Sequence, residues 1–150
     1  MKFWEKFWKL VSKKDLIFVS LIFLVVIILS FVESANKVTV TFGEAAVDIA
    51  APRYTMNVPY EMVERIELVE IAEAGENVEG RDDMITRTGR WVNEIWGEYY
   101  ACLDLQTSRC ILIHLDDGRI FAFSRRSNEE TASIYETFQS YLEIATVPAA

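Results

Sequence analysis

The stretch "CILIHLDDGRIFAF", residues 110–123, contains two apolar runs separated by Asp-Asp-Gly. Apolar runs on either side of an Asp-Gly pair are typical of a β-hairpin with a two-residue type I′ turn. A turn at Asp117 and Gly118 pairs Asp116 with Arg119, and opposite charges suit such a cross-strand pair. This stretch therefore predicts an antiparallel hairpin in the middle of a mainly β domain.

The segment before this hairpin predicts a second one. "EYYACLDL", residues 98–105, is separated from "CILIHL" by four residues. In that register Cys102 and Cys110 point to opposite faces of the sheet, whereas a three-residue loop would set them directly opposite each other. A disulfide is chemically permitted outside the cytoplasm. We expect two free thiols, both largely buried.

After residue 127 the periodicity changes to that of a helix. Glu130 follows Ser127 at the spacing of a capping box, which marks the start of a helix. Apolar residues then recur at helical spacing, namely Ile134, Phe138, Tyr141 and Leu142. The pattern predicts one amphipathic C-terminal helix over 128–144.

Upstream of residue 60, three short segments are predicted to be strands. "KVTVTF", residues 37–42, alternates apolar and polar side chains, as a half-buried strand does. "AAVDIA" (45–50) and "RYTMNV" (53–58) are apolar or alternating runs, and prolines follow both of them. These segments favour further β structure.

Residues 59–75 allow two interpretations. Pro59 could open a helix and Gly75 could close it, with Met62, Val63, Ile66 and Val69 along one face. Alternatively, residues 60–63 form a turn, and a strand containing Ile66 and Leu68 follows. The local pattern by itself favours the helix.

The stretch "KKDLIFVSLIFLVVIILSFVES", residues 13–34, has no charge from Leu16 to Val32. As a helix these 17 residues rise about 26 Å, close to the roughly 30 Å of a bilayer's hydrocarbon core. The run exceeds the apolar region of most signal peptides, and Glu33 stands where cleavage at Ala35 would need a small residue. We therefore expect an uncleaved transmembrane helix over 15–33, with signal-peptide cleavage as the alternative. Its membrane-facing residues include Leu16, Phe18, Leu21, Phe23, Val26 and Leu29.

Residues 1–14 form a basic, aromatic segment. Residues 1–15 carry five lysines against two acidic residues, whereas residues 33–150 carry 10 basic and 21 acidic residues. Aromatic rings and lysines favour the headgroup region of a membrane, and positive charge favours its cytoplasmic side. The expected interfacial residues are Trp4, Trp8, Lys13 and Lys14. The sequence thus predicts a single-pass membrane protein with a cytoplasmic N-terminus and a C-terminal domain outside the cytoplasm.

No residue pattern in the chain is typical of a catalytic site. His114 is the single histidine and lies in an apolar run, where a structural role is more common than catalysis. No Gly-rich phosphate loop, nucleophile elbow or metal-binding spacing is present, and the glutamates from 61 to 79 lack the pattern of a calcium loop. The excess of acidic residues after position 33 disfavours nucleic acid. We expect no enzyme, metal or cofactor.

Three segments together resemble the bacterial PH-like (pleckstrin-homology-like) domain family. They are "VPYEMVERIELVE" (58–70), "GRWVNEIWGEYYACLDL" (89–105) and the final "NEETASIYETFQSYL" (128–142). The resemblance covers residues 37–145 and implies a strongly bent antiparallel sheet, or partial barrel, with a C-terminal helix. It also implies that 65–71 is a strand.

Two function classes remain. The first is a membrane-anchored, non-catalytic interaction or scaffolding module with a protein or peptide partner. Its first candidate recognition surface is Trp91, Trp96, Tyr99 and Tyr100, although strand aromatics are more often packing residues. The second is a lipid-headgroup binder, which the resemblance suggests. The domain has no lysine after Lys37, and its one basic pair, Arg125 and Arg126, is followed by two glutamates. The interaction module is therefore favoured.

Overall fold

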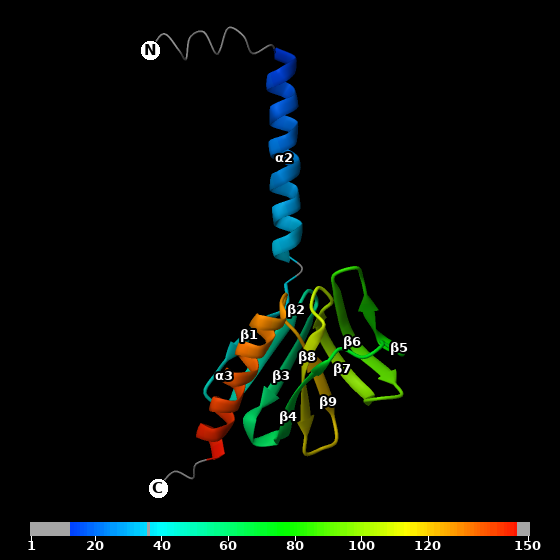
Figure 1. Ribbon diagram of the computed structural model, residues 1–150, viewed down its shortest axis with the longest axis vertical. Coiled ribbons are helices and arrows are strands. Elements are labelled where there is room, and N and C mark those ends of the chain that lie inside the picture. Colours follow the sequence, from blue (N-terminus) through cyan, green and yellow to red (C-terminus); the bar gives the residue numbers. More distant parts are fainter. Residues whose placement is uncertain (1–12, 36, 147–150) are drawn as a thin grey trace. The chain divides into compact units, whose positions relative to one another are not determined.

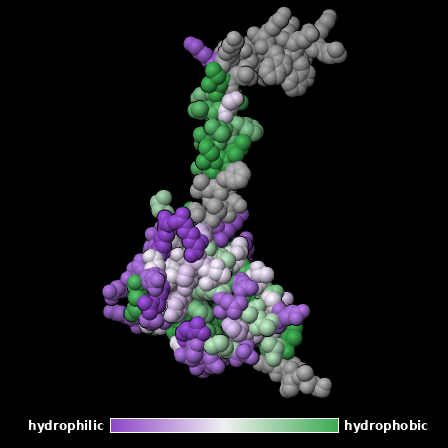
Figure 2. Space-filling view, turned by 180° about the vertical axis from the view of Figure 1, so that it is seen from behind, coloured by the Kyte–Doolittle hydropathy of each residue, from purple (hydrophilic) through white to green (hydrophobic). Residues whose placement is uncertain are grey.

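The structure, a computed structural model, describes residues 13–35 and 37–146. It divides into two units, Met1–Ala35 and Asn36–Ala150, which are described separately (Figure 1). The first unit contains helix α2, Lys13–Ala35. Its side chains are described without a gap from Ile17 to Ser30, and all of these are exposed. Figure 2 shows their largely apolar surface.

None of the helices, within the residues described, combines the length and the apolarity that a membrane span requires. The predicted segment 15–33 extends beyond this part, because the side chains of Leu16 and of residues 31–33 lie outside it. Trp4 and Trp8 also lie outside the described residues, as does the side chain of Lys13. The expected membrane segment therefore stays a prediction.

The second unit begins with a three-stranded antiparallel sheet in the order β1-β2-β3. The strands are β1 (Thr39–Phe42), β2 (Ala46–Ala51) and β3 (Tyr54–Pro59), which confirms the three strands predicted here. Alternate residues face inward, so that Val47 and Ile49 of β2 and Val58 of β3 are fully buried. Pro52 follows β2 and Pro59 is the last residue of β3, so both prolines lie at the strand ends that the sequence predicts.

The contested segment is a turn followed by a strand. A 3₁₀ turn, η1, spans Tyr60–Met62, and β4 spans Val63–Glu70. β4 pairs with β8 (Arg109–Leu115) along its whole length. Pairing with a strand far along the chain thus outweighs the helical spacing of Met62, Val63, Ile66 and Val69, as tertiary context commonly outweighs local propensity.

The larger sheet has the order β4-β8-β9-β7-β6-β5. Its remaining strands are β5 (Glu76–Asp82), β6 (Thr86–Asn93), β7 (Gly97–Asp104) and β9 (Ile120–Phe123). The predicted hairpin between residues 98–105 and 110–115 is wrong, because β9 lies between β7 and β8. β9 runs parallel to β7, so the sheet is mixed rather than wholly antiparallel. A short apolar strand buried on both faces suits this central position.

The β8–β9 hairpin is present, but its predicted register and turn are wrong by one residue. Its loop has three residues, 116–118, and Ile113 lies opposite Phe121 rather than Ala122. Gly118 adopts φ 86°, as the last residue of a three-residue loop commonly requires, and Asp117 rather than Asp116 pairs with Arg119 (2.7 Å). The observed register places large apolar side chains of both strands on the same face of the sheet. Packing on that face determines the register.

The mixed sheet has a hydrophobic core on each face. One core lies between the two sheets and helix α3 (Asn128–Thr146), whose Phe138 is fully buried against it. The other core contains Trp91, Tyr99 and Leu112. Cys102 belongs to the first core and Cys110 to the second, and both are free, buried thiols as predicted. The domain is therefore mainly β with a C-terminal helix, as the sequence indicates.

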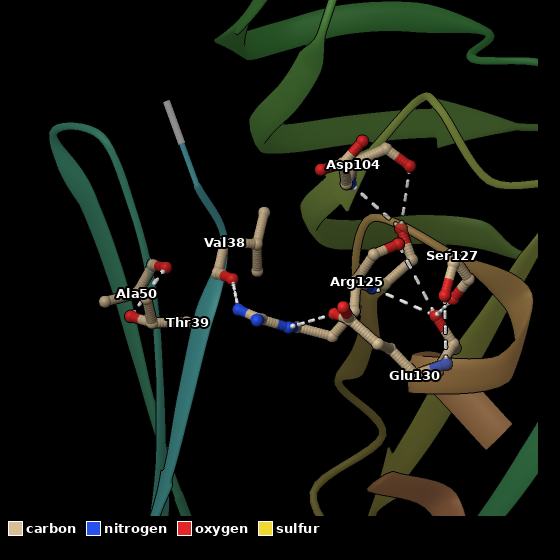
Figure 3. A network of polar contacts seen from close by, with 9 residues as sticks. Val38, Thr39, Ala50, Asp104, Arg125, Ser127 and Glu130 are labelled. Atoms are coloured by element: carbon tan, nitrogen blue, oxygen red, sulfur yellow. Dashed lines mark hydrogen bonds and ion pairs between the residues drawn. The ribbon is translucent and has the colours of Figure 1, made fainter. Parts of the chain in front are cut away.

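The start of α3 is fixed to both sheets. Ser127 Oγ accepts a hydrogen bond from the Glu130 amide (3.1 Å), which confirms the predicted cap. Arg125 donates to the Val38 carbonyl just before β1 and to Glu130 (3.3 Å), as Figure 3 shows. Arg125 is thus a structural residue that joins the beginning of the domain to its last helix.

The connection from β4 to β5 requires the mixed sheet to curl. These two strands form opposite edges of a six-stranded sheet. In a flat sheet, five steps of about 4.8 Å would separate them by about 24 Å. The chain from Glu70 to Glu76, fully extended, reaches at most about 22 Å. Residues 71–75 therefore cross one face of a bent sheet.

The two thiols provide a test of this arrangement. Burial raises the pKa of Cys102 and of Cys110 to about 12. Both should resist a water-soluble alkylating reagent in the folded protein at pH 8 and react fully in denaturant, as mass spectrometry would show. A Met84→Cys variant, at a position 97% exposed, should react at once. Rapid labelling of either native cysteine would contradict the packing.

Candidate functional site

A groove of about 590 Å³ lies over the core that contains Trp91 and Tyr99. Alternate residues of β4, namely Arg65, Glu67 and Val69, form one side of it. Their neighbours Ile66 and Leu68 face the opposite core. Because side chains of β4 alternate between the two faces of the sheet, every second one lines the groove and the others pack in the core on the opposite face.

The other walls come from segments far from β4 in the sequence. Leu112 and His114 of β8 and Ile120 of β9 form the floor, and Ile95 and Trp96 in the β6–β7 turn face them. The crossover contributes Ile71 and Ala72. The groove is consequently a product of the strand order, because three separate parts of the chain must meet to form it.

Asn93 fixes the β6–β7 turn and joins it to the crossover. Its side-chain oxygen accepts hydrogen bonds from the amides of Ile95 (3.1 Å) and Trp96 (2.6 Å). Its side-chain nitrogen donates to the Glu73 carbonyl (3.1 Å). Gly97 ends the turn at φ 71°, a conformation that glycine adopts without strain. One amide side chain therefore positions both Ile95 and Trp96 at the groove.

One end of the groove carries a charged cluster of Arg65, Glu67 and His114. The Glu67 carboxylate lies 2.6 Å from Arg65 Nε and 3.4 Å from His114 Nε2. Arg65 Nη2 lies 3.5 Å from His114 Nδ1 and 3.4 Å from Nε2. Nearly equal distances to both ring nitrogens do not fit an in-plane hydrogen bond to either one, and they favour a guanidinium packed against the ring. The cluster is therefore held together by its own contacts.

Burial and the nearby Arg65 lower the pKa of His114, and together they outweigh the opposing effects of Glu67 and Glu64. The imidazole is accordingly neutral at pH 7, with one nitrogen able to donate and the other able to accept. The cluster then holds one positive and one negative charge beside a neutral ring. This end of the groove can exchange hydrogen bonds with a polar group of a ligand.

The opposite wall is apolar and open to solvent. Ile95 is 74% exposed, although it is a large apolar residue. Trp96 is half-buried and packs edge-on against Tyr99, with ring centroids 5.0 Å apart. Tyr99 in turn donates a hydrogen bond to the Ala74 carbonyl (2.9 Å) of the crossover. Trp96 thus rests on a rigid support, and Ile95 projects beside it.

The four aromatic residues that the sequence suggests as a recognition surface do not form one surface. Trp91 and Tyr99 are buried partners on adjacent strands, and they support the groove from below. Trp96 lines the groove. Tyr100 faces the opposite core and lines a separate pocket with Tyr54. Only Trp96 of the four is therefore placed at the groove.

The groove is lined by charged, aromatic and aliphatic side chains. The groove pairs a carboxylate with an imidazole, but its lining includes no serine, threonine or cysteine that these groups could activate. Across the part of the chain that the structure describes, no group of three or more histidine, cysteine or acidic side chains could hold a metal ion. What the groove offers is a polar end and an apolar wall.

Sequence reasoning did not identify Arg65, Glu67 or Ile95 as site residues. A signal for Ile95 exists, since "NEIWG" places two large apolar residues in a turn, where polar residues are usual. Arg65 and Glu67 have no such signal, because their importance depends on the distant His114. Comparisons with protein-family models, with curated proteins and with solved structures gave no significant match to this chain.

The lowered pKa of His114 predicts a pH dependence of stability. An unfolded histidine binds protons near pH 6.5, whereas His114 in the folded domain binds them only at lower pH. The stability that neutral His114 contributes is complete above pH 6.5 and should decline as the pH falls from there through the lowered pKa. Urea unfolding between pH 7.5 and 5 would measure the decline.

A His114→Gln variant serves as the comparison, because glutamine keeps a polar side chain but does not titrate. Its free energy of unfolding should fall less than that of the wild type over the same range. Equal declines in the two proteins would show that His114 does not contribute.

Proposed function

We propose that this chain is a membrane-anchored, non-catalytic interaction module, and that its β domain binds an extended segment of a partner protein in the groove. The observation that carries the proposal is the exposed Ile95 beside the supported Trp96, in a groove that also contains a charged cluster. Aromatic residues on rigid supports commonly dominate binding energy at interfaces. An apolar side chain of the partner would pack against this wall.

The charges of the groove favour a basic residue in the partner segment. Its lining carries Arg65 against Glu67 and Glu70, so one negative charge is left over when His114 is neutral. Glu70 is exposed, whereas Glu67 is occupied by Arg65 and His114. A partner segment with an apolar residue next to a lysine or arginine would therefore suit the groove best.

The proposed anchor is residues 15–33. Its support is the uncharged sequence from Leu16 to Val32 and the exposure of every described side chain from Ile17 to Ser30. An apolar helix with no polar face needs an apolar environment around it. The lysines at 13 and 14 precede the run, which favours a cytoplasmic N-terminus.

Binding of lipid headgroups has less support. Several of the domain's arginines are engaged by acidic side chains, namely Arg65, Arg87, Arg90, Arg119 and Arg125. Arg125, one of the two residues first considered for that role, holds Val38 and Glu130. The resemblance to PH-like domains stays a prediction, and the parallel β7–β9 pair departs from the antiparallel sheet that it implies.

Site-specific photocrosslinking tests the groove. A photoreactive amino acid at position 95 of the full chain in native membranes should capture a discrete partner protein. The same residue at position 144, which is 72% exposed on α3, is the matched control and should not capture it. Trp96→Ala should reduce the yield. Identical products from both positions would contradict a specific groove.

Protease treatment tests the anchor and its orientation. Protease added to cells from which the wall has been removed should digest the domain after residue 36 and spare the residues before the apolar run. Complete protection of the domain would contradict the orientation. A mature N-terminus near Ala35 would instead show that the segment is a cleaved signal peptide.

A further inference from the structure

A second pocket, of about 390 Å³, lies between the β2–β3 turn and the β5–β6 hairpin. It shares no lining residue with the groove. Two arginines contribute to it, Arg53 from the turn and Arg81 from β5. The domain around it is strongly acidic, with 10 basic and 20 acidic residues from position 36 onward. Two arginines at one pocket are therefore a local concentration of positive charge in an acidic domain.

Arg53 occupies a position where glycine would be favoured. It is the second residue of a two-residue turn, Pro52-Arg53, between the paired residues Ala51 and Tyr54. Its φ is 64°, within the left-handed region. Turns with proline first and a positive φ second normally place glycine or asparagine there, because a β-carbon is strained in that conformation. Glycine would form this turn with less strain, yet the position carries an arginine whose side chain lines the pocket.

The pocket also contains Asp83, but this carboxylate is engaged within its own loop. It accepts hydrogen bonds from the amides of Ile85 (3.0 Å) and Thr86 (2.8 Å) and from the Thr86 hydroxyl (3.3 Å). With two arginines and one carboxylate, the lining carries a single net positive charge. This charge balances a monoanion, whereas a phosphate dianion would leave excess negative charge in acidic surroundings.

Besides the threonines Thr86 and Thr88, the pocket has an apolar part beside the arginines. Pro52 and Ile85 line it, and Met84 projects at its rim with 97% of its surface exposed. Methionine adapts readily to apolar side chains of different shapes. A ligand that fits both parts has a carboxylate next to an apolar side chain, and the C-terminal residue of a polypeptide has this combination.

We propose that the pocket binds the C-terminal carboxylate of a partner polypeptide that ends in an apolar residue. Arg53 and Arg81 hold the carboxylate, for which a guanidinium is a good geometric match. The last side chain packs on Pro52, Met84 and Ile85. This site is separate from the groove, and it binds a different part of a partner.

The experiment uses the full chain in detergent micelles and two dipeptide probes. Acetyl-Gly-Leu has a free carboxylate, and its C-terminal amide has the same side chain without the charge. The carboxylate form should shift the arginine Nε–H signals of Arg53 and Arg81 in NMR spectra, and the amide should not. Equal shifts with both probes, no shift with either, or tighter binding of inorganic phosphate than of acetyl-Gly-Leu would overturn the proposal.

An Arg53→Gly variant separates binding from folding. Because glycine relieves the strain at position 53, its melting temperature should equal or exceed that of the wild type. Its affinity for acetyl-Gly-Leu should fall by about tenfold or more, as expected for the loss of a charged hydrogen bond. Arg119→Ala, which removes an arginine paired with Asp117 on another hairpin, should leave the affinity unchanged. Unchanged affinity in Arg53→Gly would refute the proposal.

The two proposed sites can fail separately. Crosslinking from position 95 reports the groove and should persist in Arg53→Gly if the groove engages its own segment of a partner. Loss of dipeptide binding together with retained crosslinking assigns the carboxylate to the second pocket alone.

Discussion

The insertion of β9 between β7 and β8 is the constraint on which the rest of the domain depends. Ser124, directly after β9, is fully buried. Its hydroxyl accepts a hydrogen bond from the Asp104 amide and donates one to the Asp104 carbonyl, both at 2.9 Å. This exchange fixes the end of β9 to the end of β7. Asn128, at the start of α3, accepts hydrogen bonds from the Ser108 and Arg109 amides and thereby holds the β7–β8 connection against the helix.

The strand order also determines where a site can form. With β8 and β9 in the middle of the sheet, β4 and β5 become its opposite edges, and five residues must connect them across one face. The crossover covers part of that face and leaves the groove beside it. Its contacts with Asn93 and Tyr99 keep it in place. The sites therefore lie where backbone connections cross or turn, and the core beneath the groove supports them through Trp91 and Tyr99.

Local features of this fold could be predicted from the sequence, but features that depend on distant partners could not. The strands at Pro52 and Pro59 and the cap at Ser127 each have a signal within a few residues. The free thiols are predicted from a hairpin that does not form, and the structure keeps them apart because β9 lies between their strands and they belong to opposite cores. The register of the β8–β9 hairpin has none, because it depends on which face of the sheet receives Phe121 and Phe123. The position of β9 in the sheet likewise depends on strands that are distant in the sequence. At the groove, Trp96 could be anticipated from its residue type, whereas Arg65 and Glu67 become notable only once β4 lies beside β8.

The outer edge of β5 has a consequence for how copies of the chain meet. All seven residues of this strand are exposed, and an open strand edge can pair with the same edge of another molecule. Glu76, Glu79 and Asp82 lie along this strand, with Arg81 as its one basic residue. Antiparallel pairing centred on Glu79 would place Glu79 against itself and Glu76 against Asp82, and like charges in these positions repel. The bulge between Asn77 and Glu79 further interrupts the edge. The charges and the bulge therefore both disfavour pairing of this edge with the same edge of another copy.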